Sequence, residues 1–208
     1  MHTIFLKIIC GSYIICIMPD YRRIFCPGGT FFFTVVTHRR RAFLCQDTAR
    51  HCLRTAINKV RCRHPFESLA FVLLPDHFHC IWKLPEDDSD FSIRLGLIKK
   101  EFTQLWLTEG GKELAVSTAR TEHRERGIWQ KRFWEHTIRD EKDLIRHVNY
   151  IHYNPVKHSL ANCPHQWPFS SFHHWVKEGY YNHDWLCDCG IEKHKPLSLD
   201  EIKNTVGE

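Results

Sequence analysis

The sequence predicts an α+β fold with a mainly antiparallel sheet. The first observation is composition: 43% of the 208 residues are hydrophobic and 13% are aromatic, with only 10 Gly and 9 Pro, which excludes collagen-like, low-complexity and wholly disordered chains. The second is that short aromatic and β-branched runs alternate with longer amphipathic segments. The third is a pair of adjacent strand-like runs that can form a hairpin. A chain of this length is expected to form one domain with short appendages.

The first strand is predicted at about 30–38 and the first helix at 47–63. Gly28 and Gly29 precede the run TFFFTVVTH, whose aromatic and β-branched residues favour a strand. In the following segment apolar residues recur every three or four positions, opposite a face that carries arginines. This is the pattern of an amphipathic helix, and it is expected to end before Pro65.

Two further strands are predicted at 66–74 and 77–84, separated by a Pro-Asp break. Because side chains alternate along a strand, the triplet His77-Phe78-His79 places both histidines on one face and its phenylalanine on the other. The strand predicted at 77–84 therefore has one apolar face and one face that carries imidazoles.

The remaining elements are a helix at 91–107, a mobile charged loop at 108–126, a short strand or turn at 128–134 and a helix at 141–154. Pro155 is expected to stop the last helix. The order β-α-β-β-α-β-α predicts an arrangement similar to the ferredoxin-like and RNA-recognition folds, with the helices on one face of the sheet.

The charge distribution indicates a polyanionic partner. Residues 21–160 carry a net charge of +8, whereas residues 161–208 carry −3. A basic body with an acidic tail is typical of proteins that bind nucleic acids.

The ten cysteines are scattered and form no Cys-x-x-Cys pair, which argues against a zinc ribbon or finger. The spacing also differs from that of secreted disulfide scaffolds, so reduced thiols in the cytoplasm are expected. Cys187 and Cys189, with His183 and His194 around them, form an alternative metal-binding group.

The first residues are expected to lie outside the functional fold. Residues 1–18 are apolar, but Lys7 interrupts the run and its length is short for a membrane crossing. Met18 offers a second start, so residues 1–17 are interpreted as upstream of the fold. An interfacial anchor is the alternative interpretation.

His77 and His79 are candidate metal ligands, since histidines two apart on a strand can reach one ion. Two surface or structural histidines are the alternative. Tyr150 and Asn154 lie four apart on one helical face and can point at the same place. A core tyrosine and a helix-terminating asparagine are the alternative for that pair. Together the four residues fit a metal-assisted attack of a tyrosine oxygen on a phosphodiester.

The sequence resembles the REP-associated tyrosine transposases, which use a His-hydrophobic-His (HUH) motif and one tyrosine on single-stranded DNA. The resemblance is carried by LLPDHFHCIWKL, by HVNYIHYNPVKH and by longer blocks around them, at 21–37, 73–102, 127–158 and 167–173. It implies an HUH endonuclease domain at 21–175, an N-terminal extension at 1–20 and a C-terminal tail at 176–208.

The resemblance also implies the role of each site residue. His77, His79 and Asn154 match the ligands of a divalent metal, Mg²⁺ or Mn²⁺, and Tyr150 matches the nucleophile that forms a 5′-phosphotyrosine intermediate. Tyr153 is the competing tyrosine. The implied partner is a single-stranded palindromic hairpin flanked by a tetranucleotide, and no membrane partner is expected.

DNA contacts are expected from basic and aromatic residues of the body. These are Tyr21, Arg22, Arg23, Arg39, Arg40, Lys99, Lys100, Lys131 and Arg132. A protein that binds hairpins without cutting them is the alternative function. An RNA-binding protein is a weaker alternative, because an RNA-recognition fold would carry exposed aromatic side chains on adjacent strands where this sequence has histidines. The target repeat and the oligomeric state stay open.

Overall fold

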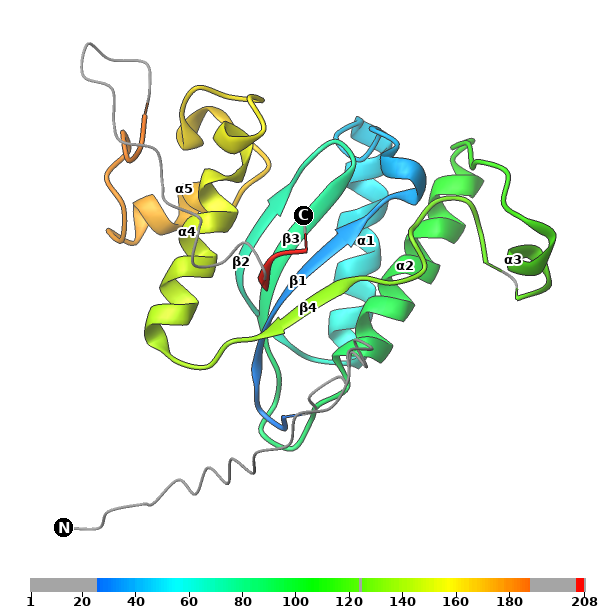
Figure 1. The fold of residues 1–208 in the computed structure, drawn as a ribbon, viewed down its shortest axis with the longest axis horizontal. Helices are drawn as coiled ribbons and strands as arrows, with labels where there is room; N and C mark the ends of the chain where they lie inside the picture. The colour runs from blue at the N-terminus through cyan, green and yellow to red at the C-terminus, as the bar shows by residue number, and fades with distance from the viewer. Residues whose placement is uncertain (1–25, 124, 188–204, 208) are drawn as a thin grey trace, which may run out of the picture.

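The computed structural model describes residues 26–123, 125–187 and 205–207 (Figure 1). The elements are β1 (Thr30–Val36), η1 (His38–Arg40), α1 (Asp47–Arg63), β2 (Glu67–Leu73), β3 (His77–Lys83), α2 (Phe91–Thr108), α3 (Thr118–Glu122), β4 (Trp134–Thr137), α4 (Glu141–Lys157), η2 (Pro164–Gln166) and α5 (Phe172–Lys177). The predicted order β-α-β-β-α-β-α is present, and the short helices η1, α3, η2 and α5 are additional to it.

The four strands form one sheet in the order β2-β3-β1-β4, and every neighbouring pair is antiparallel. This confirms the predicted α+β fold. The register between β1 and β3 pairs Thr34 with His79 and Val36 with His77. The two histidines therefore lie on β3, an interior strand of the sheet, where pairing with β1 and β2 holds the backbone in place.

Each face of the sheet has its own apolar core. Phe31 and Phe33 of β1 pack with α1 and α2 on one face, whereas Phe32, between them, packs with α4 on the other. In Figure 1, α1 and α2 lie together on one side of the sheet and α4 lies on the opposite side. The helices therefore cover both faces and not the single face predicted from the sequence, because β1 and β3 present buried side chains to each side. The alternation of β1 and β3 thus directs the imidazoles toward α4, as the pattern of β3 predicts.

Three local predictions differ from the structure. Helix α4 continues through Pro155 to Lys157, because a proline in the last turn removes only one backbone donor from the helix. The charged loop contains a short helix, α3. The strand expected at 128–134 instead begins at Trp134, and Trp129 forms only an isolated bridge with Thr37.

The segment that follows α4 packs against β2. The indole nitrogens of Trp167 and Trp175 donate to the backbone carbonyls of Leu73 and Leu69, at 2.9 and 3.0 Å. These contacts attach the tryptophans of this segment to β2. Val206 belongs to the same core as α4, so residues on both sides of position 175 contact the sheet layer. The boundary at 175 stays a prediction.

Among the helices in the described ranges, none combines the length and the apolar character that crossing a bilayer requires.

Candidate active site

His77 and His79 form a buried pair at the centre of the sheet. Their side chains lie on the same face of β3, and their ring centroids are 4.9 Å apart. The residues are 1% and 0% exposed. Side chains two apart on a strand point the same way, so the backbone itself brings the two rings together.

Each imidazole has a hydrogen-bond partner that orients it, the neighbouring Asp76 for His77 and the distant Thr34 for His79. Asp76 Oδ1 lies 2.6 Å from Nδ1 of His77, and Thr34 Oγ1 lies 2.9 Å from Nδ1 of His79. Because these contacts engage Nδ1, Nε2 becomes the candidate ligand atom of each ring. Carboxylate and hydroxyl partners of this kind fix the orientation of metal-binding histidines.

The carboxyl group of Asp76 is held in its charged form. Burial acts to raise its pKa, but hydrogen bonds and charge from His77 and Arg40 outweigh burial and lower the pKa below its usual value. Arg40 approaches the second oxygen of the carboxylate at 3.1 Å. A negatively charged partner increases the basicity of a ligating imidazole, which suits His77 to a divalent cation.

Tyr150 lies on α4 directly above the imidazoles. Its ring centroid is 5.2 Å from that of His79 and 6.0 Å from that of Phe32, and the residue is 1% exposed. The face of α4 that packs on the sheet therefore brings a phenol to the histidine pair.

Asn154, one turn further along α4, is fully buried, and both polar atoms of its side chain lack a hydrogen-bond partner among the described residues. A buried amide without partners costs about 1–3 kcal/mol. A cation bound by the amide oxygen would remove part of this cost. The donor set of two imidazoles and one amide oxygen fits a divalent metal, because Mg²⁺ and Mn²⁺ prefer oxygen and also accept nitrogen ligands.

Lys157 is a site residue that the sequence analysis missed. Its Nζ donates to the hydroxyl of Tyr150 at 3.1 Å and lies 4.9 Å from the centre of the phenol ring. The seven-residue spacing places the two side chains on one side of the helix, two turns apart. This spacing could have identified Lys157 from the sequence. It was not used, because the helix was predicted to stop at Pro155, before Lys157.

His158 is also close to the pair, with its ring centroid 5.3 Å from that of His77. Tyr153, the competing tyrosine, is half-buried on α4. A ring contact joins Tyr150 to His79. The choice of Tyr150 stays a prediction that this geometry favours.

A second group of titratable side chains lies behind Phe32. His136 Nε2 is 2.9 Å from Asp143 Oδ2, and the rings of His136 and His147 stack at 4.6 Å. Burial raises the pKa of Asp143, but the hydrogen bond from His136 and further contacts outweigh it, so the pKa is lowered. Burial lowers the pKa of His147. This network ties β4 to the first turns of α4.

The residues predicted to contact DNA fall in three places. Tyr21, Arg22 and Arg23 lie outside the described residues. Arg39 and Arg40 are exposed in η1, where Arg40 reaches the active-site carboxylate of Asp76. The others lie around α2 and the start of β4, at Lys99, Lys100, Lys131 and Arg132.

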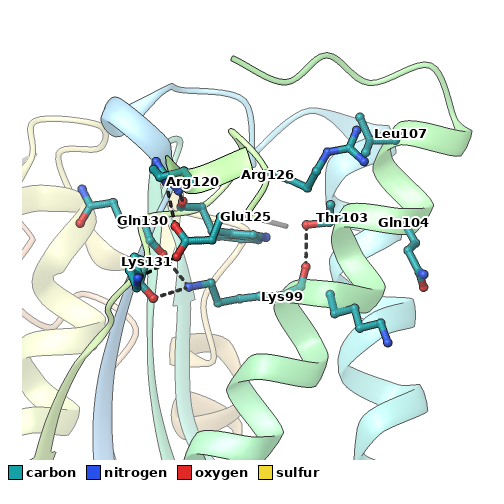
Figure 2. Close-up of a pocket in the computed structure, with 11 residues that line it drawn as sticks. Lys99, Thr103, Gln104, Leu107, Arg120, Glu125, Arg126, Gln130 and Lys131 are labelled. Carbon is teal, nitrogen blue, oxygen red and sulfur yellow. Dashed lines mark hydrogen bonds and ion pairs between the residues drawn. The ribbon is translucent and has the colours of Figure 1, made fainter. Parts of the chain in front are cut away.

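Of the four basic residues around α2 and the start of β4, Lys99 points inward. Figure 2 shows it extending from α2 toward the 130–131 segment, where its Nζ donates to the carbonyls of Gln130 and Lys131 at 2.6 and 3.2 Å. Burial lowers the pKa of Lys99 to about 8. Lys100, Lys131 and Arg132 are exposed, although Lys131 forms an ion pair with Glu125 at 2.9 Å. Lys99, Lys100 and Lys131 line a cavity of about 630 Å³, to which Arg120 and Arg126 also contribute.

Comparison with known proteins gives close relatives. No model of a known protein family matches the chain. A REP-associated tyrosine transposase of Escherichia coli (strain K12) is 47% identical over 171 residues, which cover 82% of this chain and 93% of that protein. A Haemophilus influenzae protein described under the same family name is 43% identical over 175 residues, 81% of this chain and 93% of that protein. The solved structure of a REP-associated tyrosine transposase bound to a REP hairpin gives a TM-score of 0.69 at 45% identity, and covers 87% of this chain and 100% of that one.

Proposed function

Because the chain belongs to the REP-associated tyrosine transposases, we propose that it cuts and rejoins single-stranded DNA at palindromic hairpin repeats, with Tyr150 as the nucleophile. One observation carries the proposal: the phenol of Tyr150 lies against His79, one turn from the unpartnered amide of the buried Asn154. In this proposal the nucleophile, two candidate ligands and an amide oxygen act together between β3, which carries His77 and His79, and α4, which carries Tyr150 and Asn154.

The proposed reaction is a transesterification. The hydroxyl oxygen of Tyr150 gives up its proton and attacks phosphorus, the bond from phosphorus to the 3′ oxygen breaks, and that oxygen takes up a proton. The product is a 5′-phosphotyrosine and a free 3′-hydroxyl. Attack of another strand's 3′-hydroxyl on the phosphotyrosine reverses these steps, so rejoining needs no nucleotide cofactor.

The side chains around Tyr150 have distinct roles in this proposal. Lys157 donates to the tyrosine oxygen and stabilises the negative charge that this oxygen carries before attack. Asp76 and Thr34 hold the imidazoles of His77 and His79 in place. A divalent cation held by the two histidines and Asn154, Mg²⁺ or Mn²⁺, would supply Lewis-acid polarisation of the scissile phosphate.

The proposed substrate is a single-stranded hairpin with a flanking tetranucleotide. It is supported by the relative whose structure was solved with a REP hairpin and by the basic charge of residues 21–160. A cytoplasmic location, which the sequence analysis expects, is part of this proposal. An RNA-recognition role has less support, because the aromatic residues of β1 and β3 are buried and cannot offer stacking platforms to bases.

Hairpin binding without cleavage is the second candidate function. The burial of Tyr150, at 1% exposed, favours it, since a nucleophile must be reached by its substrate. The test is incubation of the protein with a labelled single-stranded hairpin and Mg²⁺ or Mn²⁺. The transposase proposal expects cleavage and a covalent protein–DNA adduct that withstands denaturation. Retained binding with neither product would establish the second candidate instead.

A further inference from the structure

A second group of metal-ligand side chains lies away from the proposed active site, after α4. Cys163 precedes η2, His165 lies within η2, and Cys187 follows α5. One ligand atom from each of the three residues lies within 4.8 Å of the other two. In the structure the two cysteines are joined as a disulfide, which differs from the reduced thiols that the sequence predicts.

His165 provides a second observation that points to a bound metal ion. Nδ1 of His165 is buried and has no hydrogen-bond partner among the described residues. A second imidazole, that of His183, stacks on it with ring centroids 4.1 Å apart. Of the metal-binding group that the sequence indicated, Cys187 and His183 therefore lie here, whereas Cys189 and His194 fall outside the described residues.

We infer that in the reduced protein Cys163, His165 and Cys187 bind a structural zinc ion, with His183 as the nearest candidate for a fourth ligand. Two thiolates and one or two imidazoles are the donors that Zn²⁺ prefers. Tetrahedral zinc with bonds of about 2.0–2.3 Å separates its ligand atoms by roughly 3–4 Å. The three side chains already lie within 4.8 Å of one another, so after reduction of the disulfide the two sulfurs need only move apart to admit the ion.

The compartment decides between a disulfide and zinc. This step rests on the proposed function, since a protein that acts on chromosomal DNA meets a thiol-reducing environment, where disulfides are rare. Reduction of the cystine by a cellular dithiol yields two thiols and oxidises the dithiol to its disulfide. Each thiol then releases one proton on binding zinc as a thiolate.

The proposed zinc would stabilise the segment between Cys163 and Cys187, which packs against the helix that carries Tyr150. The segment closed by Cys163 and Cys187, 24 residues apart in the sequence, contacts α4 through Tyr181. Its hydroxyl donates to Asn149 Oδ1 at 2.6 Å and lies 3.3 Å from Nδ1 of His152. A metal that ties the two ends of this segment together contributes directly to folding.

The test uses the full chain, purified under reducing conditions and loaded with Co²⁺ or Zn²⁺. We expect one metal ion to bind with two thiolates, seen with Co²⁺ as a cobalt–thiolate charge-transfer band, in addition to any ion at the proposed catalytic site. Cys163→Ser and Cys187→Ser should abolish the band, and His165→Ala should weaken or lose it. Cys62→Ser is the matched control, because Cys62 is an exposed free cysteine outside the cluster. Circular dichroism of each variant establishes that it is folded.

The double variant His77→Ala/His79→Ala separates this site from the proposed catalytic one. It should retain the cobalt–thiolate band even though hairpin cleavage is lost. A protein isolated from cells with Cys163 and Cys187 disulfide-linked would overturn the inference. So would a reduced protein that shows no thiolate band, whatever its activity on DNA.

Discussion

The ammonium group of Lys157 lies 3.1 Å from the hydroxyl of Tyr150, seven residues earlier on the same helix. The lysine is exposed while the tyrosine is buried, so a cation at the surface reaches the oxygen from the solvent side. This contact exists only because α4 runs through Pro155 to its last residue, Lys157. The end of the helix thereby joins the proposed nucleophile to a positive charge.

Replacing Lys157 by methionine should slow adduct formation while hairpin affinity changes little. The substitution keeps the aliphatic stem and removes the charge that favours the tyrosine anion. Loss of one preorganised electrostatic contact typically lowers a rate by about 10²–10³-fold. Single-turnover cleavage kinetics measure the effect. Lys142→Met, on an exposed lysine in the first turn of α4, is the matched control. Equal rates in both variants would show that Lys157 has no part in the chemistry.

Tyr150→Phe should abolish the covalent adduct and leave hairpin binding nearly unchanged, because only the attacking oxygen is lost. Tyr153→Phe should retain the adduct. Mass spectrometry of digested adduct identifies the modified residue. The assignment would be reversed by an adduct that survives in the first variant and disappears in the second.

Asn154→Leu should separate metal binding from folding. Removing a buried amide that lacks partners in the described structure is expected to raise the melting temperature of the metal-free protein, since such a group costs about 1–3 kcal/mol. The same variant should lose the rise in melting temperature that Mn²⁺ causes in the wild type through mass action. Mn²⁺ is the appropriate probe because it binds thiolates weakly.

His77→Ala is the companion variant, and it should lose the Mn²⁺ effect while remaining folded. A Mn²⁺-dependent shift of wild-type size in both variants would exclude this place as the metal site. Unfolding of His77→Ala in the absence of metal would instead favour a structural role for the histidine pair.

Acid should destabilise the protein through His152. The side chain of His152 is 0% exposed, and its Nε2 lies 2.8 Å from Oγ of Ser171. Burial lowers the pKa of His152 to about 3. Between about pH 6.5 and 3 the unfolded chain binds a proton here that the folded protein does not, so stability falls as the pH falls. The contribution approaches about 1.4 kcal/mol per pH unit.

Urea unfolding near neutral pH and at about pH 5 measures this dependence. His152→Gln, which cannot be protonated, should show a smaller loss of stability than the wild type over the same interval. The attribution to His152 fails when wild type and variant have the same pH dependence.

Periodicity in the sequence predicted the part of the site that one element can specify. The alternation of β3 placed His77 and His79 on one face, and the helical spacing placed Tyr150 and Asn154 together. The orienting partner of His79 was not predictable in this way, because Thr34 lies on a strand 45 residues away in the sequence. The disulfide of Cys163 likewise joins segments that no local pattern relates. Lys157 was missed for a different reason, since a general rule about proline ended the helix too early.

The inward turn of Lys99 leads to a distinction among the predicted DNA contacts. Lys100 and Arg132 are exposed and are proposed to neutralise phosphates. Replacing both by alanine should reduce the slope of log affinity against log salt by about 1.4, since each contact to a single strand contributes roughly 0.7.

Lys99→Met should instead lower the melting temperature of the protein, because Nζ of Lys99 donates to two backbone carbonyls. Titration of a labelled hairpin at several salt concentrations, with thermal unfolding of each variant, measures both effects. Lys193→Ala/Lys195→Ala in the acidic C-terminal region is the control and should leave the slope unchanged. A reduced slope in Lys99→Met with unchanged stability would restore Lys99 to the DNA contacts predicted from the sequence.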